Sequence, residues 1–230
     1  MSRIESNLQH VRACIDAAIA GLPQERRKAV TLVAVSKAKS AADVREAFAA
    51  GQRAFGENYV QEAIAKIEAT SDLRPRGLTW HFIGPLQSNK ARQVAQHFDW
   101  MHAIDRLKIA QALSMHRAGL PPLNVCLQIN VSGEASKSGV APADALALAR
   151  QIAGLPALTF RGLMAIIENT PDETAQRTQF RMMHKLFEML IASGLAVDTL
   201  SMGMSHDYRV AVEEGATMVR VGSEIFGVRK

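Results

Sequence analysis

The chain opens with apolar residues at helical spacing and continues into a short, fully apolar run. The positions that recur every three or four residues are Ile4, Leu8, Val11, Ile15 and Ile19, a spacing that predicts an amphipathic helix. After a turn at residues 21–23, the run at 30–35 reads Val-Thr-Leu-Val-Ala-Val. Such a β-branched run is typical of a strand buried on both faces.

Strand-like and helix-like segments then alternate to the C-terminus. The further strand candidates are residues 53–56, 79–84, 100–104, 124–131, 160–167, 199–203 and 217–222. A helix-length stretch follows each of the first seven of the eight strands, which implies parallel pairing with crossover helices. The pattern predicts an α/β fold, a single-domain (β/α)8 TIM barrel over residues 1–230 with an extra N-terminal helix. A doubly wound open sheet is the alternative, because a short candidate such as 53–56 can be misassigned.

Capping residues predict where two helices begin. The sequence Thr170-Pro171-Asp172-Glu173 offers a Thr cap, a Pro at the first helical position and a Glu three residues after the cap. Asp105 is expected to cap the helix over residues 107–113.

Composition and charge narrow the functional classes. The two cysteines, Cys14 and Cys126, are far apart and lack metal-ligand spacing, which argues against a disulfide framework or a zinc site. Residues 1–22 carry charges throughout, and no stretch approaches the ~18 apolar residues of a membrane span. We expect a soluble cytoplasmic protein without a membrane partner.

The net charge of +5 raises the question of nucleic-acid binding. The 27 Lys and Arg residues are scattered along the chain, and aromatic residues make up only 5%. A solvated surface with some positive potential for a phosphorylated ligand is therefore favoured over a nucleic-acid interface.

Lys37 is the sharpest chemical candidate. In a (β/α)8 barrel the working residues lie at the C-terminal ends of the strands, and Lys37 follows the first strand directly. Partial desolvation there is expected to favour the neutral amine, which forms Schiff bases with carbonyl compounds. The alternative is a solvated loop lysine, with Lys39 as its equivalent.

The turns after the last two strands are candidates for binding phosphate. Residues 201–205 read Ser-Met-Gly-Met-Ser and residues 220–223 read Arg-Val-Gly-Ser, in the place where barrels frequently hold phosphate. Small residues let the backbone approach an anion, and hydroxyls can donate to its oxygens. A pair of ordinary turns is the alternative.

A Schiff-base lysine and a phosphate cradle on one barrel face suit a ligand with an aldehyde and a phosphate. A phosphosugar, as in an aldolase, and pyridoxal 5′-phosphate (PLP) both qualify. Arg220 lies two residues before Gly222, so both can face the barrel interior. An inward arginine could donate to the pyridine nitrogen of PLP. A structural ion pair with an acidic residue is the alternative role for Arg220.

Five stretches of the chain form a recognisable set. They are residues 35–37 (Val-Ser-Lys), 55–62 (Phe-Gly-Glu-Asn-Tyr-Val-Gln-Glu), 81–90 (His-Phe-Ile-Gly-Pro-Leu-Gln-Ser-Asn-Lys), 200–205 (Leu-Ser-Met-Gly-Met-Ser) and 219–227 (Val-Arg-Val-Gly-Ser-Glu-Ile-Phe-Gly). In this order, and over nearly the whole chain, they resemble the pyridoxal phosphate homeostasis protein family.

The resemblance implies a PLP-binding barrel similar to the N-terminal domain of alanine racemase. It implies that Lys37 holds the cofactor and that Arg220 faces the pyridine nitrogen. The other cofactor-binding residues it implies are Ser205, Gly222 and Ser223 at the phosphate, Ser201 assisting there, and Asn58 near the ring. The departures from the family pattern are His206-Asp207-Tyr208, where an acidic residue is more usual at His206, and the end of strand six at residues 165–168.

The family is understood to bind PLP and maintain its supply, with no established catalytic reaction. The expected partners are therefore PLP and PLP-requiring apoenzymes, and the chain is expected to be a monomer. An arginine donates but cannot accept, so Arg220 favours an unprotonated pyridine and weakens PLP as an electron sink. A racemase-like PLP enzyme is the first alternative, and a Schiff-base aldolase is the second.

Three smaller expectations concern residues around this site. A racemase needs a second acid or base on the opposite face of the ring. The two tyrosines are Tyr59 and Tyr208, and Tyr59 is expected to pack instead. His206 is expected to begin a helix at the phosphate turn. The charged loop at residues 134–139 is expected to be a lid over the ligand or a solvated turn.

Overall fold

Eight parallel strands close into a barrel in the computed structural model, which describes residues 2–134 and 138–227. The strands are β1 Thr31–Val35, β2 Ala54–Glu57, β3 Thr79–Phe82, β4 Trp100–Ile104, β5 Leu123–Ile129, β6 Leu158–Ala165, β7 Thr199–Ser201 and β8 Met218–Val221. Each strand pairs with its neighbours in chain order, and residues 31–34 of β1 pair with residues 218–221 of β8. The predicted (β/α)8 barrel is confirmed, and the open sheet is excluded because β8 returns to β1.

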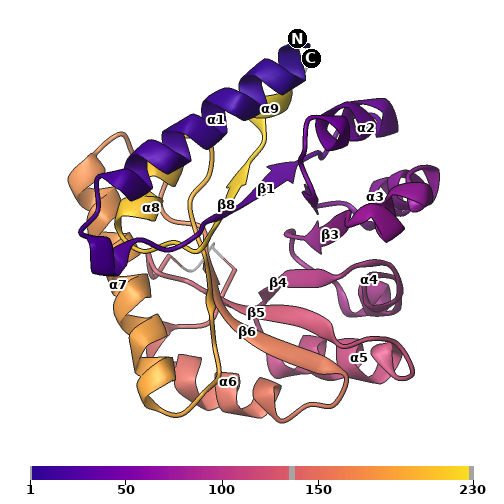
Figure 1. Ribbon diagram of the computed structural model, residues 1–230. Helices are drawn as coiled ribbons and strands as arrows, with labels where there is room; N and C mark the ends of the chain where they lie inside the picture. The colour runs from indigo at the N-terminus through magenta and orange to yellow at the C-terminus, as the bar shows by residue number, and fades with distance from the viewer. Residues whose placement is uncertain (1, 135–137, 228–230) are drawn as a thin grey trace.

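Helices cover the outside of the barrel (Figure 1). Those that connect one strand to the next are α2 Ala41–Ala49, α3 Val60–Ala69, α4 Ala91–His97, α5 Leu107–Arg117, α6 Ala145–Ala153, α7 Glu173–Ala192 and α8 Tyr208–Glu213. A single turn of helix, α9 Ser223–Phe226, follows β8. Short 3-10 segments lie at Gln24–Arg26, Ser71–Arg76, Ser88–Lys90 and Pro142–Asp144.

The predicted N-terminal helix is α1 Arg3–Ala20, which begins at a capping box between Ser2 and Glu5. Its buried face consists of Ile4, Leu8, Val11 and Ile15. The helix packs against α8, α9 and α2, so it lies beside the seam where β8 meets β1 (Figure 1). The Asn7 side-chain amide donates to the carbonyl oxygen of Ile225 at 2.9 Å, which ties α1 to α9.

Alternate residues of each strand face the barrel interior and the surrounding helices. On β1 and β8 the residues that join the core between sheet and helices are Leu32, Ala34, Val219 and Val221. The interior holds a separate apolar cluster of Val33, Ala54 and Met218, with Trp100 against it. Arg220 is the next inward residue of β8 after Met218, so it lies above this apolar layer, toward the C-terminal ends of the strands.

The predicted cap of α7 is wrong. The helix begins at Glu173, and the Asp172 carboxylate caps it by accepting a hydrogen bond from the N–H of Thr174 at 2.9 Å. The Thr170 hydroxyl oxygen accepts from the N–H of Asp172 at 3.1 Å instead. Thr170 therefore stabilises the turn before the helix, and Asp172 caps the helix.

Two other predictions at helix starts are also wrong by one or two residues. The helix α5 begins at Leu107, but its N-cap is Arg106, and the carboxylate of Asp105 accepts from the Arg106 guanidinium at 2.8 and 2.9 Å instead of capping the helix. His206 lies in the turn before α8, which begins at Tyr208 with Asp207 as its N-cap residue.

Candidate functional site

A cavity of about 440 Å³ opens at the C-terminal ends of the strands. Six of the seven predicted site residues line it: Lys37, Asn58, Ser205, Arg220, Gly222 and Ser223. They come from β8 and from the segments after β1, β2, β7 and β8. The barrel thus brings together residues from both ends of the sequence, on the face where barrel sites are expected.

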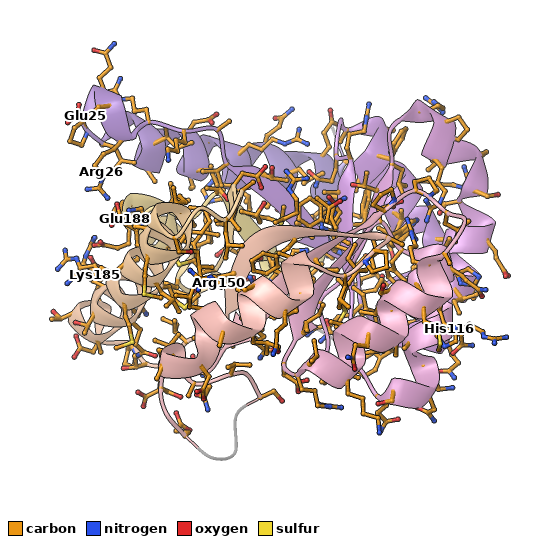
Figure 2. The ribbon with its side chains drawn as sticks, turned by 90° about the horizontal axis from the view of Figure 1, so that it is seen from below. Glu25, Arg26, His116, Arg150, Lys185 and Glu188 are labelled. Atoms are coloured by element: carbon orange, nitrogen blue, oxygen red, sulfur yellow. The ribbon has the colours of Figure 1, made fainter. Side chains whose placement is uncertain are left out.

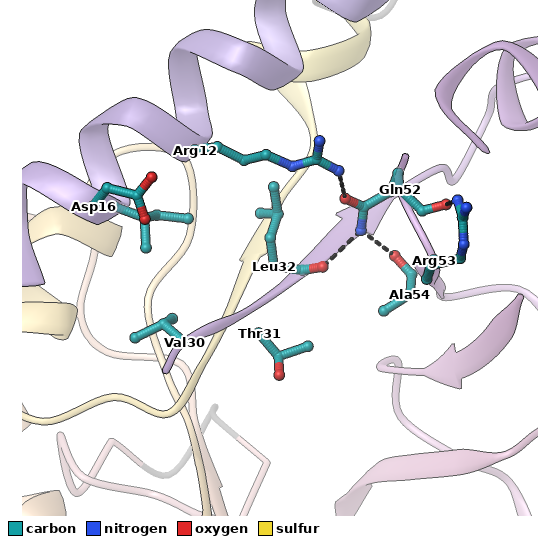
Figure 3. Close-up of a pocket in the computed structure, with 9 residues that line it drawn as sticks. Arg12, Asp16, Val30, Thr31, Leu32, Gln52, Arg53 and Ala54 are labelled. Atoms are coloured by element: carbon teal, nitrogen blue, oxygen red, sulfur yellow. Dashed lines mark hydrogen bonds between the residues drawn. The ribbon is translucent and has the colours of Figure 1, made fainter. Parts of the chain in front are cut away.

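A second hollow, of about 340 Å³, lies at the opposite end of β1 and β2. Figure 3 shows the Gln52 side chain between Arg12, Leu32 and Ala54. The Gln52 amide nitrogen donates to the carbonyls of Leu32 and Ala54 at 2.6 and 2.8 Å, and its oxygen accepts from Arg12 at 3.1 Å. Because these polar groups form hydrogen bonds with one another, the residues around this hollow serve to connect α1 to the sheet.

Lys37 and Lys39 occupy different positions around the cavity. Lys37 is half-buried in the turn directly after β1, as the sequence predicted. Lys39 also lines the cavity, but its Nζ donates to the carbonyl oxygens of Phe226 and Gly227, each at 3.1 Å. Lys39 therefore ties the turn after β1 to the end of α9.

The turn after β7 is tightly folded. Gly203 has a φ of +92°, and a Cβ there would lie 2.6 Å from the Cβ of Ala211 and 2.9 Å from the Cα of Tyr208. The N–H of Met204 donates to the Asp207 carboxylate at 2.5 Å. This contact turns the chain so that Ser205 reaches the cavity.

The turns after β7 and β8 meet at the cavity. The N–H of Gly222 points at the Oγ of Ser205 at 3.4 Å, a long hydrogen bond that a stronger acceptor could replace. A Cβ on Gly222 would lie 3.1 Å from the carbonyl oxygen of Val35. Backbone N–H and hydroxyl groups thus converge where small residues allow an anion to approach.

Arg220 is buried, with 3% of its surface exposed. Its Nη1 donates to the Oγ of Ser201 at 2.7 Å, and its Nη2 donates to the carbonyl oxygen of Ala165 at 2.9 Å. Burial lowers the pKa of its guanidinium to about 10. Both acceptors are neutral, so these contacts orient Arg220 toward the cavity without cancelling its charge.

Ser201 differs from the prediction. It is fully buried behind Arg220 and is not one of the residues that line the cavity in the described part of the chain. The Nδ1 of His102 lies 3.0 Å from its Oγ, and the Nε2 of His102 lies 2.9 Å from the Nδ1 of His81. The Nε2 of His81 in turn lies 3.3 Å from the Oγ1 of Thr79. Ser201 therefore links Arg220 to a row of polar groups inside the barrel.

The two histidines of this row are neutral at neutral pH. Burial lowers the pKa of His81 to about 3. The pKa of His102 lies well below its ordinary value, chiefly through burial and further through electrostatic interaction with His81 and with the Arg220 guanidinium. Sequence reasoning missed both residues as members of the site, although His81 stands in one of the five recognised stretches.

Asn58 has an unused hydrogen-bond acceptor beside the cavity. Its Oδ1 is buried and has no hydrogen-bond partner in residues 2–134 and 138–227, and the residue lines the cavity. A buried acceptor of this kind requires a donor. The cavity thus offers a buried acceptor at Asn58 beside the guanidinium of Arg220 and the donors of the turns after β7 and β8.

The remaining lining residues were not predicted as ligand contacts. Ile83, Ile166 and Met204 give the cavity apolar walls, and His206 also lines it with an exposed side chain. The loop at 134–139 includes residues 135–137, which lie outside the described residues, so its role as a lid stays a prediction.

The two tyrosines and Cys126 lie outside the cavity lining. Tyr59 is 55% exposed, so the prediction that it packs is wrong. Tyr208 is buried, and its hydroxyl donates to the Glu224 carboxylate at 3.2 Å. Neither tyrosine lines the cavity within the described residues. Burial raises the pKa of the Cys126 thiol to about 12, which suppresses its nucleophilicity.

The outer surface mixes acidic and basic side chains. Figure 2 shows Lys185 and Glu188 together on α7, and His116 projecting from α5. Arg177 pairs with Glu173, Glu213 and Glu214 at 2.6, 2.5 and 3.0 Å. Across residues 2–134 and 138–227, no helix combines the length and apolar character needed to cross a membrane. Within the same residues, His, Cys, Asp and Glu side chains form no cluster of metal-site size.

Known proteins resemble this chain over its full length. A family model described as alanine racemase, N-terminal domain, matches residues 2–230. The "Pyridoxal phosphate homeostasis protein" of Pseudomonas aeruginosa is 56% identical over 100% of this chain and 97% of its own length. The protein of the same name from Escherichia coli is 50% identical over 100% of this chain and 98% of its own length.

Solved structures give the same picture. PipY of Synechococcus elongatus, solved with PLP bound, is 40% identical over 97% of this chain and 100% of that chain, with a TM-score of 0.82. An alanine racemase of Clostridium difficile is 15% identical, with a TM-score of 0.70 over 97% of this chain and 57% of that chain. This second likeness concerns the fold alone.

Proposed function

The chain belongs to the pyridoxal phosphate homeostasis protein family, and from this membership we propose that it binds PLP as a Schiff base on Lys37. Its role is to maintain the supply of PLP in the cytoplasm and to deliver it to apoenzymes that require it, as a monomer and without a reaction of its own. One observation carries the proposal: Lys37, Arg220 and the two small-residue turns line the same cavity.

The described residues give each part of PLP a partner. Ser205, Gly222 and Ser223 hold the phosphate with hydroxyl and backbone donors. Arg220 donates to the pyridine nitrogen, and the unused Oδ1 of Asn58 accepts from the ring hydroxyl. The predicted phosphate contact of Ser201 is replaced by a supporting contact, since its Oγ holds Arg220.

Lys37 supplies the covalent link. Its amine lone pair forms a C=N bond to the aldehyde carbon, and the aldehyde oxygen leaves as water with the two amine hydrogens. Bound PLP would supply an aldehyde for capture and an aromatic ring that can withdraw electrons. Arg220 limits the second property, because a guanidinium stabilises the unprotonated ring nitrogen.

Within the described residues, no tyrosine stands at the cavity as the second acid or base that a racemase needs. Tyr59 is exposed and Tyr208 is committed to Glu224, and neither lines the cavity within the described residues. The relatives from Pseudomonas aeruginosa and Escherichia coli are named as homeostasis proteins. These observations support a carrier more strongly than an amino-acid racemase.

The direct test is the visible spectrum of the purified protein with PLP, before and after borohydride reduction. The wild-type protein should show an imine band, and peptide mapping after reduction should locate the adduct on Lys37. Lys37→Ala should lose the adduct, whereas Lys39→Ala and the exposed-surface control Lys108→Ala should keep it. An adduct of undiminished yield in Lys37→Ala would remove Lys37 from its role.

The absence of catalysis is tested separately. The PLP-loaded protein is incubated with L-amino acids in deuterated water, and exchange at the α-carbon is followed by NMR. We expect no exchange above that of free PLP. Exchange that depends on the protein would show that the chain is a racemase-like enzyme.

A further inference from the structure

The N-terminal side of the Lys37 turn is held by two buried charged residues. Ser36 is fully buried, and its Oγ donates to the Oε1 of Glu57 at 2.6 Å. Its carbonyl oxygen accepts from the Nζ of Lys66 at 2.7 Å. Glu57 ends β2 and Lys66 lies on α3, so the residue before Lys37 is anchored to two other elements of the barrel.

The C-terminal side of the same turn is held by a third charged residue. Ala38 has a φ of +59°, a left-handed conformation that is unfavourable for any residue with a Cβ. Its N–H donates to the Oε1 of Glu62 at 2.6 Å. This contact compensates for the strain of Ala38, so the residues on both sides of Lys37 have fixed positions.

A single ammonium group joins the two sides. The Nζ of Lys66 donates to the Ser36 carbonyl, and it donates to Glu57 and Glu62 at 2.6 and 2.8 Å. These contacts use all three N–H donors of an ammonium group. The Lys66 side chain is only 6% exposed. Lys66 is therefore a charged anchor, and it is unsuited to be a nucleophile.

Stability alone does not explain this arrangement. Buried ion pairs carry a large desolvation cost, and well-packed apolar residues often replace them without loss. Glu57 is fully buried, and its Oε2 has no hydrogen-bond partner in the described residues. Burial also raises the pKa of the Glu57 carboxyl above its ordinary value. A costly arrangement directly beneath a strained turn is typical of a functional constraint.

We propose that Glu57, Glu62 and Lys66 form a clamp that positions Lys37 for covalent capture of PLP. We call these three residues the Lys37 clamp; they act on the cofactor only through the turn. This inference rests on the proposed function. It adds that the clamp controls the rate of capture, whereas the phosphate turns and Arg220 control the affinity for the uncaptured ligand.

The test measures these two properties separately. Apo-protein is mixed with PLP in a stopped-flow instrument, and the growth of the imine band gives the rate of capture. Affinity without capture is measured by calorimetry with pyridoxine 5′-phosphate, which carries an alcohol in place of the aldehyde. Glu62→Ala should slow capture about tenfold or more, as expected when a reacting group is misplaced. It should leave the affinity for pyridoxine 5′-phosphate unchanged.

Two further variants on α3 serve as controls. Glu62→Gln keeps an acceptor for the Ala38 N–H and should capture PLP within about twofold of the wild-type rate, since only the charge is lost. Glu68→Ala removes an exposed carboxylate from the same helix and should behave as wild type.

A fourth variant tests the buried members of the clamp. Lys66→Met alone would leave two carboxylates unpaired and can fail to fold, so Lys66→Met is combined with Glu57→Gln to keep the interior neutral. The double variant should fold, as judged by circular dichroism, and should capture PLP at least as slowly as Glu62→Ala.

The outcomes separate the clamp from the proposed function. If the wild-type protein forms no imine, the proposed function fails. If the wild type captures PLP and Glu62→Ala does so at the same rate, the clamp proposal fails. Equal losses of capture rate and of pyridoxine 5′-phosphate affinity would also overturn it, because Glu62 would then shape the whole cavity.

Discussion

Arg220 Nη1 lies 2.7 Å from Ser201 Oγ, and this contact joins the guanidinium to a row of hydrogen bonds inside the barrel. A guanidinium cannot accept a hydrogen bond, so the Ser201 oxygen must accept here. Its own hydroxyl hydrogen is then available to the Nδ1 of His102, at 3.0 Å. The Nε2 of His102 lies 2.9 Å from the Nδ1 of His81, so the row continues from Arg220 into the barrel interior.

Removing the middle of this row should destabilise the protein. Ser201→Ala leaves a donor of Arg220 and the Nδ1 of His102 buried without a partner. The free energy of unfolding should fall by about 1–3 kcal/mol, the usual cost of a buried unsatisfied polar group. Urea unfolding measures this, with Ser6→Ala on the exposed side of α1 as the control. Equal stabilities of the two variants would contradict the role of Ser201.

The buried histidines should make the protein sensitive to acid. The folded-state pKa of His81 is about 3 and that of His102 is well below its ordinary value, whereas both are about 6.5 in the unfolded chain. The unfolded state therefore binds more protons below about pH 6.5, and linkage predicts that stability falls as the pH falls from there toward about 3. Each histidine contributes up to about 1.4 kcal/mol per pH unit.

The measurement is urea unfolding across this pH range in wild type and in the variant His81→Gln/His102→Gln. The variant will be less stable at neutral pH, but its stability should decline less steeply on acidification. Parallel pH profiles for the two proteins would show that the acid sensitivity comes from other groups.

The tight turn after β7 should not tolerate a side chain. Gly203→Ala combines a φ of +92° with a Cβ 2.6 Å from that of Ala211. Gly194 has a similar φ of +87°, but a Cβ added there would meet nothing within 4 Å. We expect Gly194→Ala to cost about 1–2 kcal/mol from the backbone alone. Gly203→Ala should cost a further 1–3 kcal/mol or so from overpacking. Thermal and urea unfolding should show this order, and the reverse order would contradict the close packing at Gly203.

The Lys37 clamp should also show strong coupling between its buried members. Lys66→Met should lower the free energy of unfolding by about 3–5 kcal/mol, because it leaves the Glu57 carboxylate buried without its ammonium. Adding Glu57→Gln should recover part of this loss, since the buried charge is then gone. A double-mutant cycle in urea measures the coupling. Additive losses would mean that Glu57 and Lys66 do not interact as their 2.6 Å separation indicates.

The strands could be predicted because a parallel barrel buries both faces of each strand. The strand candidate at 100–104 coincides with β4, whereas the candidate at 199–203 extends past β7, which ends at Ser201. The strand stops there because Gly203 adopts a positive φ, a property that composition does not reveal. The helix caps were misplaced because Thr170 and Asp105 use their side chains in other local hydrogen bonds.

Site residues could be predicted from the sequence only where their position along a strand indicates that they face the ligand-binding end of the barrel. Lys37 and Arg220 could be found because each lies at or near the end of a strand, on the face where barrels bind ligands. Lys66 reads in the sequence as an ordinary helical lysine, and its burial depends on two carboxylates from different elements. His102 is recognisable only through Ser201, which lies 99 positions later in the sequence.

The pairing of β1 with β8 has a consequence for the folding of the chain. Lys37 follows the first strand and Arg220 belongs to the last. The two sides of the cavity therefore come together only when the last strand has paired with the first. A ligand held across this joint binds the finished ring and not a partly folded chain. By mass action it therefore stabilises the closed ring. If the chain binds PLP as proposed, bound cofactor would in this way hold the barrel closed.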